Sequence, residues 1–272
     1  DAPRASRGMI PPPPMSRPRA QVHARARGES SAHSLHRALV EHAQWLVPLQ
    51  FFRSLHGNAM ASERKMSFSP RSSVPPEQLW LFTEQGTAQQ ASTQGALLGT
   101  YVLGVDGVSL FGSLTPEVTS VHINAGGFDG DLLALSGAAL AALRAWAGLV
   151  HLERGLAVHA APRHAPELAG ALQAYRTFHV PFFPDGRLIA KAGYEGYRQP
   201  VVVCTGPDSY ETFVGALDVA LQGQVQLRRL DLASLHGEVA RQDVDALYLN
   251  PLGPGPTGLW PRAVCDALVA PR

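Results

Sequence analysis

Apolar and polar residues follow the same order in two separate stretches of the chain. Residues 35–45 carry apolar side chains at the spacing of a helix. The Val-Pro pair at 47–48 is expected to end that helix, because the residue before a proline avoids the helical conformation. Residues 168–178 repeat the pattern and lead to a second Val-Pro pair at 180–181. The pattern therefore predicts a helix that ends at Val-Pro in each stretch.

Two short apolar runs in each stretch predict buried strands that end in a polar residue. Residues 79–83 and 201–205 end in threonine, and residues 121–124 and 247–250 end in asparagine. Each threonine precedes a predicted helix, and each asparagine precedes a loop and then another helix. The ordered set occurs twice at near-equal spacings, which predicts a tandem repeat.

The repeat predicts an α/β (α+β) fold made of two structurally similar modules, each with a small mixed sheet packed by helices. The first module is expected at 31–153 and the second at 166–272, with a linker at 154–165 between them. Residues 1–30 are rich in proline and arginine and show no apolar periodicity. They are therefore predicted to be a disordered leader.

The repeated elements resemble the N-terminal domain pattern of the bacterial SseB (enhanced serine sensitivity) family. The resemblance rests on the helix that ends in Val-Pro, the Phe-Thr strand end at 82–83, and the strand-Asn-(Pro/Ala)-x-Gly element at Asn124 and Asn250. It covers residues 35–150 well and residues 168–272 more loosely. The resemblance implies a cytoplasmic bacterial protein without an established reaction, so it informs the fold more than the function.

Six residues are candidates for contact with a ligand or a partner. Four of them end the predicted strands: Thr83, Asn124, Thr205 and Asn250. Open α/β sheets bind ligands at strand ends, although threonine and asparagine also serve there as caps and turn residues. The other two, Trp45 and Phe178, belong to aromatic groups near the Val-Pro pairs. Those rings either pack in the core or line a groove for a partner peptide.

The segment 253–258 matches the dinucleotide fingerprint G-x-G-x-x-G. Pro254 and Pro256 remove two of the backbone amides that would hold a phosphate. The chain after Gly258 is also too short for a second βα unit. We therefore expect a structural turn before a helix at 260–269, and no nucleotide cofactor.

No side-chain pattern in the sequence indicates catalysis or metal binding. The eleven histidines lack the H-E-x-x-H spacing, and no G-x-S-x-G nucleophile motif is present. Cys204 and Cys265 have no metal-binding spacing and lie in apolar surroundings, so both are predicted to be buried thiols. No catalytic residue, metal ligand or cofactor is expected.

The charge distribution narrows the class of partner. The net charge is +1, but the leader holds six arginines and two acidic residues, so the rest has 17 basic and 20 acidic residues and a net charge of −3. A slightly acidic chain outside the leader does not favour nucleic-acid binding. No apolar run reaches the roughly 18 residues that a membrane span needs.

No signal peptide is recognised, so a cytoplasmic location is expected. The sequence favours a non-enzymatic module that binds another protein; the alternative is a small-ligand sensor or enzyme that uses the polar strand ends.

Overall fold

The computed structural model describes most of the chain outside the leader. The described ranges are 31–48, 77–93, 102–125, 133–158, 175–191 and 193–269, with single positions at 20 and 24. Within them the chain forms eight helices and ten strands, which make four small sheets. The fold is therefore mixed α/β. The predicted leader, apart from positions 20 and 24, and the predicted helix start at 168 lie outside the described residues.

The first half of the described chain contains three helices and five strands. They are α2 (Ala32–Val40), β1 (Trp45–Pro48), β2 (Gln78–Leu81), α4 (Gln85–Thr93), β3 (Val102–Val105), α5 (Gly107–Gly112), β4 (Ser120–Ile123) and β5 (Leu133–Ser136). β1 pairs antiparallel with β3, β2 pairs parallel with β4, and β4 pairs antiparallel with β5. A bridge between Leu46 and Phe82 joins the two ladders, so the strand order is β3-β1-β2-β4-β5.

The second half contains the remaining strands and four helices. They are β6 (Phe178–Phe182), β7 (Pro200–Val203), α8 (Pro207–Gly215), α9 (Val219–Gln222), β8 (Gln226–Leu230), α10 (Leu232–Arg241), β9 (Ala246–Leu249), β10 (Gly258–Pro261) and α11 (Arg262–Val269). β6 pairs antiparallel with β8, β7 parallel with β9, and β9 antiparallel with β10. A bridge between His179 and Cys204 joins the ladders, so the order β8-β6-β7-β9-β10 has the same pairing directions as the first half.

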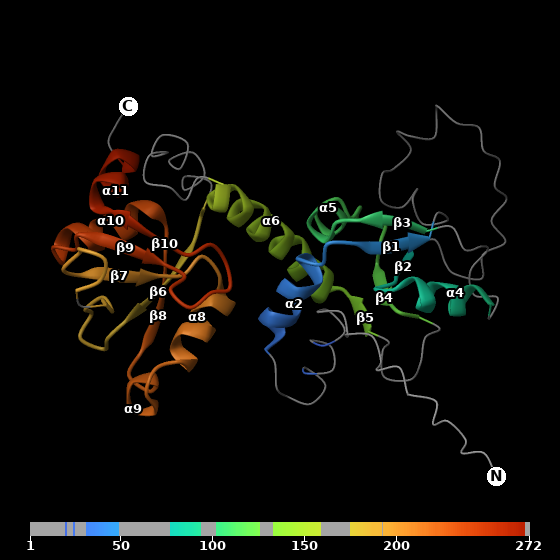
Figure 1. Cartoon of the computed structure of the whole chain (residues 1–272), viewed down its shortest axis with the longest axis horizontal. Coiled ribbons are helices and arrows are strands. Elements are labelled where there is room, and N and C mark those ends of the chain that lie inside the picture. Colours follow the sequence, from blue (N-terminus) through green and yellow to red (C-terminus); the bar gives the residue numbers. More distant parts are fainter. Residues whose placement is uncertain are drawn as a thin grey trace, which may run out of the picture.

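One long helix, α6 (Ala138–Val158, 21 residues), connects the two halves. Figure 1 shows it running from beside α2 and α5 towards the sheet of the second half. Leu143 belongs to the core of the first half, whereas Leu156 belongs to the core of the second. The helix continues through the first residues of the predicted linker and ends at Val158.

The predicted role of the two Val-Pro pairs was wrong. The first predicted helix ends at Val40, and the Val-Pro pair at 47–48 lies in strand β1; the pair at 180–181 lies in strand β6. The residue before a proline does avoid the helical conformation, but it does so here by adopting the extended conformation of a strand and not by ending a helix. The predicted last helix also begins later, at Arg262, since Trp260 and Pro261 belong to β10.

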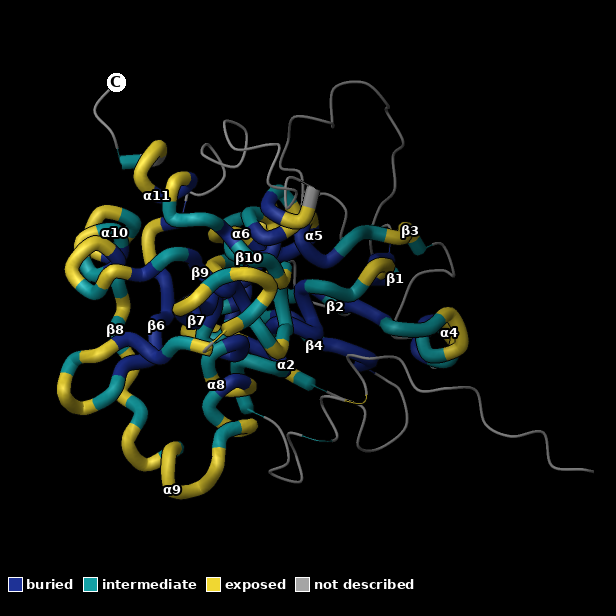
Figure 2. Tube along the Cα trace, turned by 60° about the vertical axis from the view of Figure 1, so that its left-hand side comes forward, coloured by how far each residue is buried: buried dark blue, intermediate teal, exposed yellow. Residues whose placement is uncertain are grey.

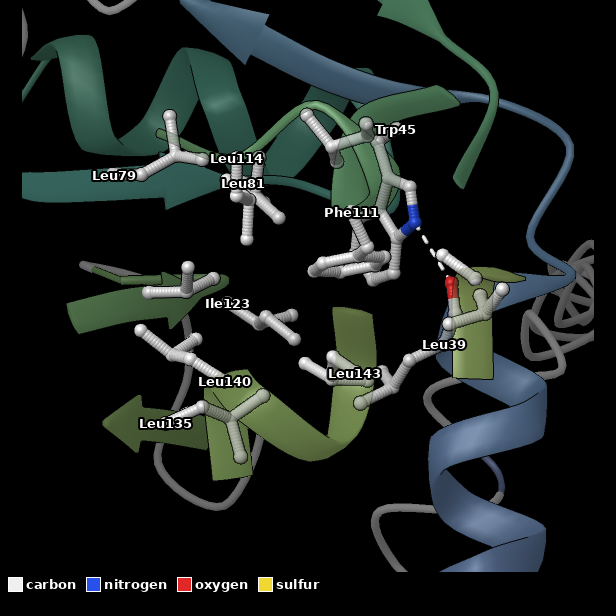
Figure 3. Packing of buried hydrophobic residues seen from close by; sticks show 14 of the residues in the cluster. Leu39, Trp45, Leu79, Leu81, Phe111, Leu114, Ile123, Leu135, Leu140 and Leu143 are labelled. Atoms are coloured by element: carbon white, nitrogen blue, oxygen red, sulfur yellow. Dashed lines mark hydrogen bonds between the residues drawn. The ribbon is translucent and has the colours of Figure 1, made fainter. Parts of the chain in front are cut away.

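The strands of each half have buried apolar residues that pack under the helices. Figure 3 shows Leu79, Leu81 and Ile123 of the first sheet facing Leu140 and Leu143 of α6. In the second half the corresponding core is covered by α10 and α11. Figure 2 shows β6, β7 and β9 buried, while β3 and β8 are more exposed and α9 lies exposed at the periphery. Because apolar side chains fill both cores, the polar candidate side chains lie at the ends of the central strands.

Candidate functional site

The four predicted strand-end residues form two equivalent pairs. In the second half the backbone amide of Thr205 donates to Asn250 Oδ1 over 2.9 Å, and Asn250 Nδ2 donates to Thr205 Oγ1 over 2.9 Å. In the first half the Thr83 amide donates to Asn124 Oδ1 over 3.0 Å, and Asn124 Nδ2 donates to Thr83 Oγ1 over 3.2 Å. The parallel pairings β2–β4 and β7–β9 place each threonine beside its asparagine.

The backbone conformation explains why asparagine occupies both positions. Asn124 has φ of 55° and Asn250 has φ of 41°. Asparagine tolerates this left-handed region better than most residues, because its short amide can bond to nearby backbone. Each asparagine therefore turns the chain out of its strand and at the same time ties it to the end of the neighbouring strand.

The second pair is extended by charged residues from three helices. Arg37 of α2 forms a bidentate pair with Glu153 of α6, with Nη1–Oε2 at 2.5 Å and Nη2–Oε1 at 3.0 Å. Arg37 also donates from Nε and Nη2 to the carboxylate of Asp208 in α8. Thr205 Oγ1 donates to Glu153 Oε1 over 2.5 Å. We call Arg37, Glu153, Thr205, Asp208 and Asn250 the Arg37 cluster.

The members of the Arg37 cluster are almost fully withdrawn from solvent. Arg37, Thr205 and Asp208 are each 1% exposed, Glu153 is 4% exposed and Asn250 is 0% exposed. Burial raises the pKa of Asp208, although its contacts with Arg37 oppose that rise. Burial acts to lower the pKa of Arg37, but the hydrogen bonds with Glu153 and Asp208 outweigh it and hold that pKa above its ordinary value. The guanidinium is therefore charged and is the cation that offsets two buried carboxyl groups.

The glycine-rich segment 253–258 closes over this cluster. Asn250 Nδ2 donates to the Pro256 carbonyl over 3.0 Å, and Ser209 Oγ donates to the Pro254 carbonyl. A Cβ added to Gly255, where φ is 107°, would lie 2.8 Å from Asn250 Nδ2. Only glycine fits there, because the loop approaches the cluster closely and takes a conformation that L side chains avoid.

The same segment connects two antiparallel strands, β9 and β10, rather than a strand and a helix. A dinucleotide fingerprint needs a helix start directly after the loop, where free amides meet the phosphates. The observed contacts agree with the predicted structural role of the segment. The strand ends of the second half are consequently filled by the protein's own side chains and loop.

The two aromatic candidates are both buried. Trp45 is 0% exposed and Phe178 is 1% exposed. Trp45 Nε1 donates to the Leu39 carbonyl over 2.9 Å, and its ring meets Phe111 edge-on (Figure 3). Both rings therefore pack in the hydrophobic cores, Trp45 in that of the first half and Phe178 in that of the second.

The sequence analysis missed the charged members of the Arg37 cluster. Arg37 lies among the buried residues Leu35, Ala38 and Leu39 of α2, so a charge on the apolar face of a helix was the available signal. Its partners Glu153 and Asp208 are 116 and 171 residues away, and no local spacing connects them.

The predicted buried thiols are confirmed. Cys204 and Cys265 are both buried and free. Burial raises the pKa of each thiol to about 12. Neither side chain therefore forms the thiolate that a nucleophile requires near neutral pH.

An open pocket of about 260 Å³ lies on the second sheet, and none of the residues of the Arg37 cluster lines it. Apolar side chains form most of its wall, and one lysine and one tyrosine complete it. The lining residues are Ile189, Ala190, Lys191, Val202, Phe213, Leu217, Tyr248, Pro251 and Leu252.

The described ranges contain neither a cluster of metal-binding side chains nor a membrane-spanning helix. Within those ranges, no three histidine, cysteine, aspartate or glutamate residues lie close enough to hold a metal ion together. None of the helices there combines the length and apolar character needed to cross a membrane.

Comparison with protein-family models, with curated proteins and with solved structures gave no match to this chain. The resemblance to the SseB pattern therefore rests on the residues of this sequence alone.

Proposed function

We propose that this chain is a non-enzymatic, cytoplasmic SseB-like protein that serves as a protein-interaction or scaffold module. In this proposal residues 31–153 and 166–272 are two diverged copies of one module. The copies are supported by the shared strand order and by the matching Thr-Asn hydrogen bonds at Thr83–Asn124 and Thr205–Asn250.

The Arg37 cluster carries the argument against catalysis at the second sheet. Open α/β sheets bind ligands outside the carboxyl ends of their parallel strands. At that place in the second half, Thr205 and Asn250 are fully engaged by each other, by Glu153 and by the loop over them. A buried, self-satisfied polar network stabilises a fold and leaves no group free for a substrate.

The alternative is a small-ligand sensor or enzyme that uses the polar strand ends. The strand ends of the first half support it better than those of the second. Thr83 is partly exposed, whereas its counterpart Thr205 is buried. A ligand that used the strand ends would therefore have to reach Thr83 and Asn124.

Photo-crosslinking in the cell of origin tests the proposal. A crosslinking amino acid is placed at three exposed apolar positions of the full chain, Leu103, Val219 and Leu252. We expect reproducible adducts with the same discrete protein from at least one position.

Isothermal titration of the full chain with NAD, NADP, FAD, ATP and serine tests the alternative. Saturable binding that Asn124→Ala abolishes, together with the absence of a protein adduct, would overturn the proposed function. Asn250→Ala is the matched control, because a ligand at the first sheet does not contact that residue.

A further inference from the structure

The pocket on the second sheet lies on the opposite face from the main core. Val202 and Tyr248 are direct partners in the β7–β9 ladder. Their neighbours in β7 and β9, Val201 and Leu247, belong to the core under α10 and α11. Because successive side chains of a strand point to opposite faces, Val202 and Tyr248 form the floor of the pocket on the other face.

The walls of this pocket are apolar and its rim is exposed. Phe213 of α8 and Leu217 beyond it stand on one side, and Ile189 stands on another. Leu252 lines the pocket and is 55% exposed, so an apolar side chain at the pocket is open to contact from outside. The volume of about 260 Å³ is below the range of about 300–1,000 Å³ that is typical of drug-sized ligands. The pocket therefore suits one or two apolar side chains of a larger molecule.

A cation stands at the rim of the pocket. The Lys191 ammonium lies 3.7 Å from the ring centroid of Tyr194 and 5.7 Å from that of Tyr248. The two tyrosine rings stack with centroids 4.9 Å apart, and their hydroxyl oxygens are 3.3 Å apart. Among the described residues, the contacts of this ammonium are with aromatic faces and not with a carboxylate. The rings hold the charge in place beside the apolar pocket without neutralising it.

We propose that this pocket binds a short segment of a partner protein, which inserts a large apolar side chain and sets an adjacent carboxylate against Lys191. The inference rests on the proposed function and names the surface and the partner chemistry that it would use. An acidic-apolar segment satisfies both features of the site, because the apolar side chain covers Leu252 and the carboxylate supplies a counter-charge that none of the described residues gives to Lys191.

Selection from a displayed library of random peptides against the immobilised full chain tests the inference. We expect the enriched peptides to share a large apolar residue next to aspartate or glutamate. Synthetic copies of these peptides should bind the full chain and lose about tenfold or more in affinity with Lys191→Glu or Leu252→Asp. Both replaced side chains are exposed, so circular dichroism should show an unchanged fold.

Arg198→Glu is the matched control, since it makes the same charge change at a side chain that is 80% exposed and does not line the pocket. It should leave affinity within about twofold. Failure to enrich any motif, enrichment of basic peptides, or equal losses in Lys191→Glu and Arg198→Glu would each overturn the inference. Tighter binding of octanoate than of any peptide, or dimerisation of the chain that Leu252→Asp abolishes, would assign the pocket to a different occupant and overturn it as well.

The peptide-binding experiment can fail without contradicting the proposed function. A discrete protein adduct from Val219 or Leu103, combined with no peptide binding at the pocket, would leave the proposed function standing and the site wrong. Peptide binding that Lys191→Glu weakens would support both.

Discussion

Replacement of Arg37 by alanine should destabilise the protein more than the same replacement of a solvent-exposed arginine. Arg37→Ala takes away the cation that faces Glu153 and Asp208, which are 4% and 1% exposed. Loss of one partner from a buried ion pair typically costs about 3–5 kcal/mol, because the remaining charge is left without water or a counter-ion. Here two buried carboxylates and the half-buried Glu41 lose the same partner, so we expect at least about 3 kcal/mol. That is a large part of the about 5–15 kcal/mol that a typical domain has available.

Urea denaturation at pH 7, followed by circular dichroism, measures this loss. Arg154→Ala is the matched control, because Arg154 lies next to Glu153 on α6 and pairs with Asp106 over 2.9 Å while 48% of its side chain is exposed. An exposed pair of this kind should cost less than about 1 kcal/mol.

The cost of Arg37→Ala should also shrink as the pH falls. Burial already raises the pKa of Asp208 in the presence of Arg37, and loss of the guanidinium removes the contacts that oppose this rise. The folded state then binds more protons than the unfolded state, so the stability of the variant rises as pH decreases through that window. A loss below about 1 kcal/mol at pH 7, or a loss that is equal at pH 7 and pH 5, would refute the assigned role of the cluster. If Arg37→Ala does not fold, adding Glu153→Gln and Asp208→Asn should restore folding, because both uncompensated charges are then removed.

Three further predictions concern the buried Asn250, His179 and the two cysteines. Asn250→Ala should cost about 1–3 kcal/mol in urea denaturation and more than Asn124→Ala, because the hydrogen bonds that it breaks are more deeply buried; equal costs would contradict this. Burial, with the nearby charge of Arg229, lowers the pKa of His179 to about 4, so the unfolded state binds more protons between about pH 6.5 and 4. Stability should therefore fall as pH falls through that window, by up to about 3 kcal/mol, and His179→Gln should remove this dependence. Cys204 and Cys265 should react with iodoacetamide only after unfolding; rapid labelling of the native chain would show that the thiols are accessible.

Local sequence patterns were sufficient to locate the central strands of both halves. The apolar runs that end at Thr83, Asn124, Thr205 and Asn250 predicted β2, β4, β7 and β9, each within one or two residues. Short continuous apolar runs are typical of strands that are buried on both faces, and this signal does not depend on distant residues.

Local patterns gave the wrong element where the same residues suit both a helix boundary and a strand. The Val-Pro pairs indicated a helix end, yet the structure uses them inside β1 and β6. Trp260 and Pro261 suited a helix start, but pairing with β9 makes them a strand. A proline and the residue before it are compatible with an extended chain in either setting, so pairing with a neighbouring strand decides which one forms.

The Arg37 cluster shows what only the tertiary structure decided. Its residues come from α2, α6, α8 and the ends of β7 and β9, and the ion pairs span more than a hundred positions of sequence. The sequence determined that Thr205 and Asn250 would stand at strand ends. Whether those ends remained open for a ligand depended on the packing of α2 against α6 and α8, which brought Arg37 and Glu153 to the same site. Helical periodicity encodes which face of each helix is buried, but the partners of a buried charge are set by the packing of the whole fold.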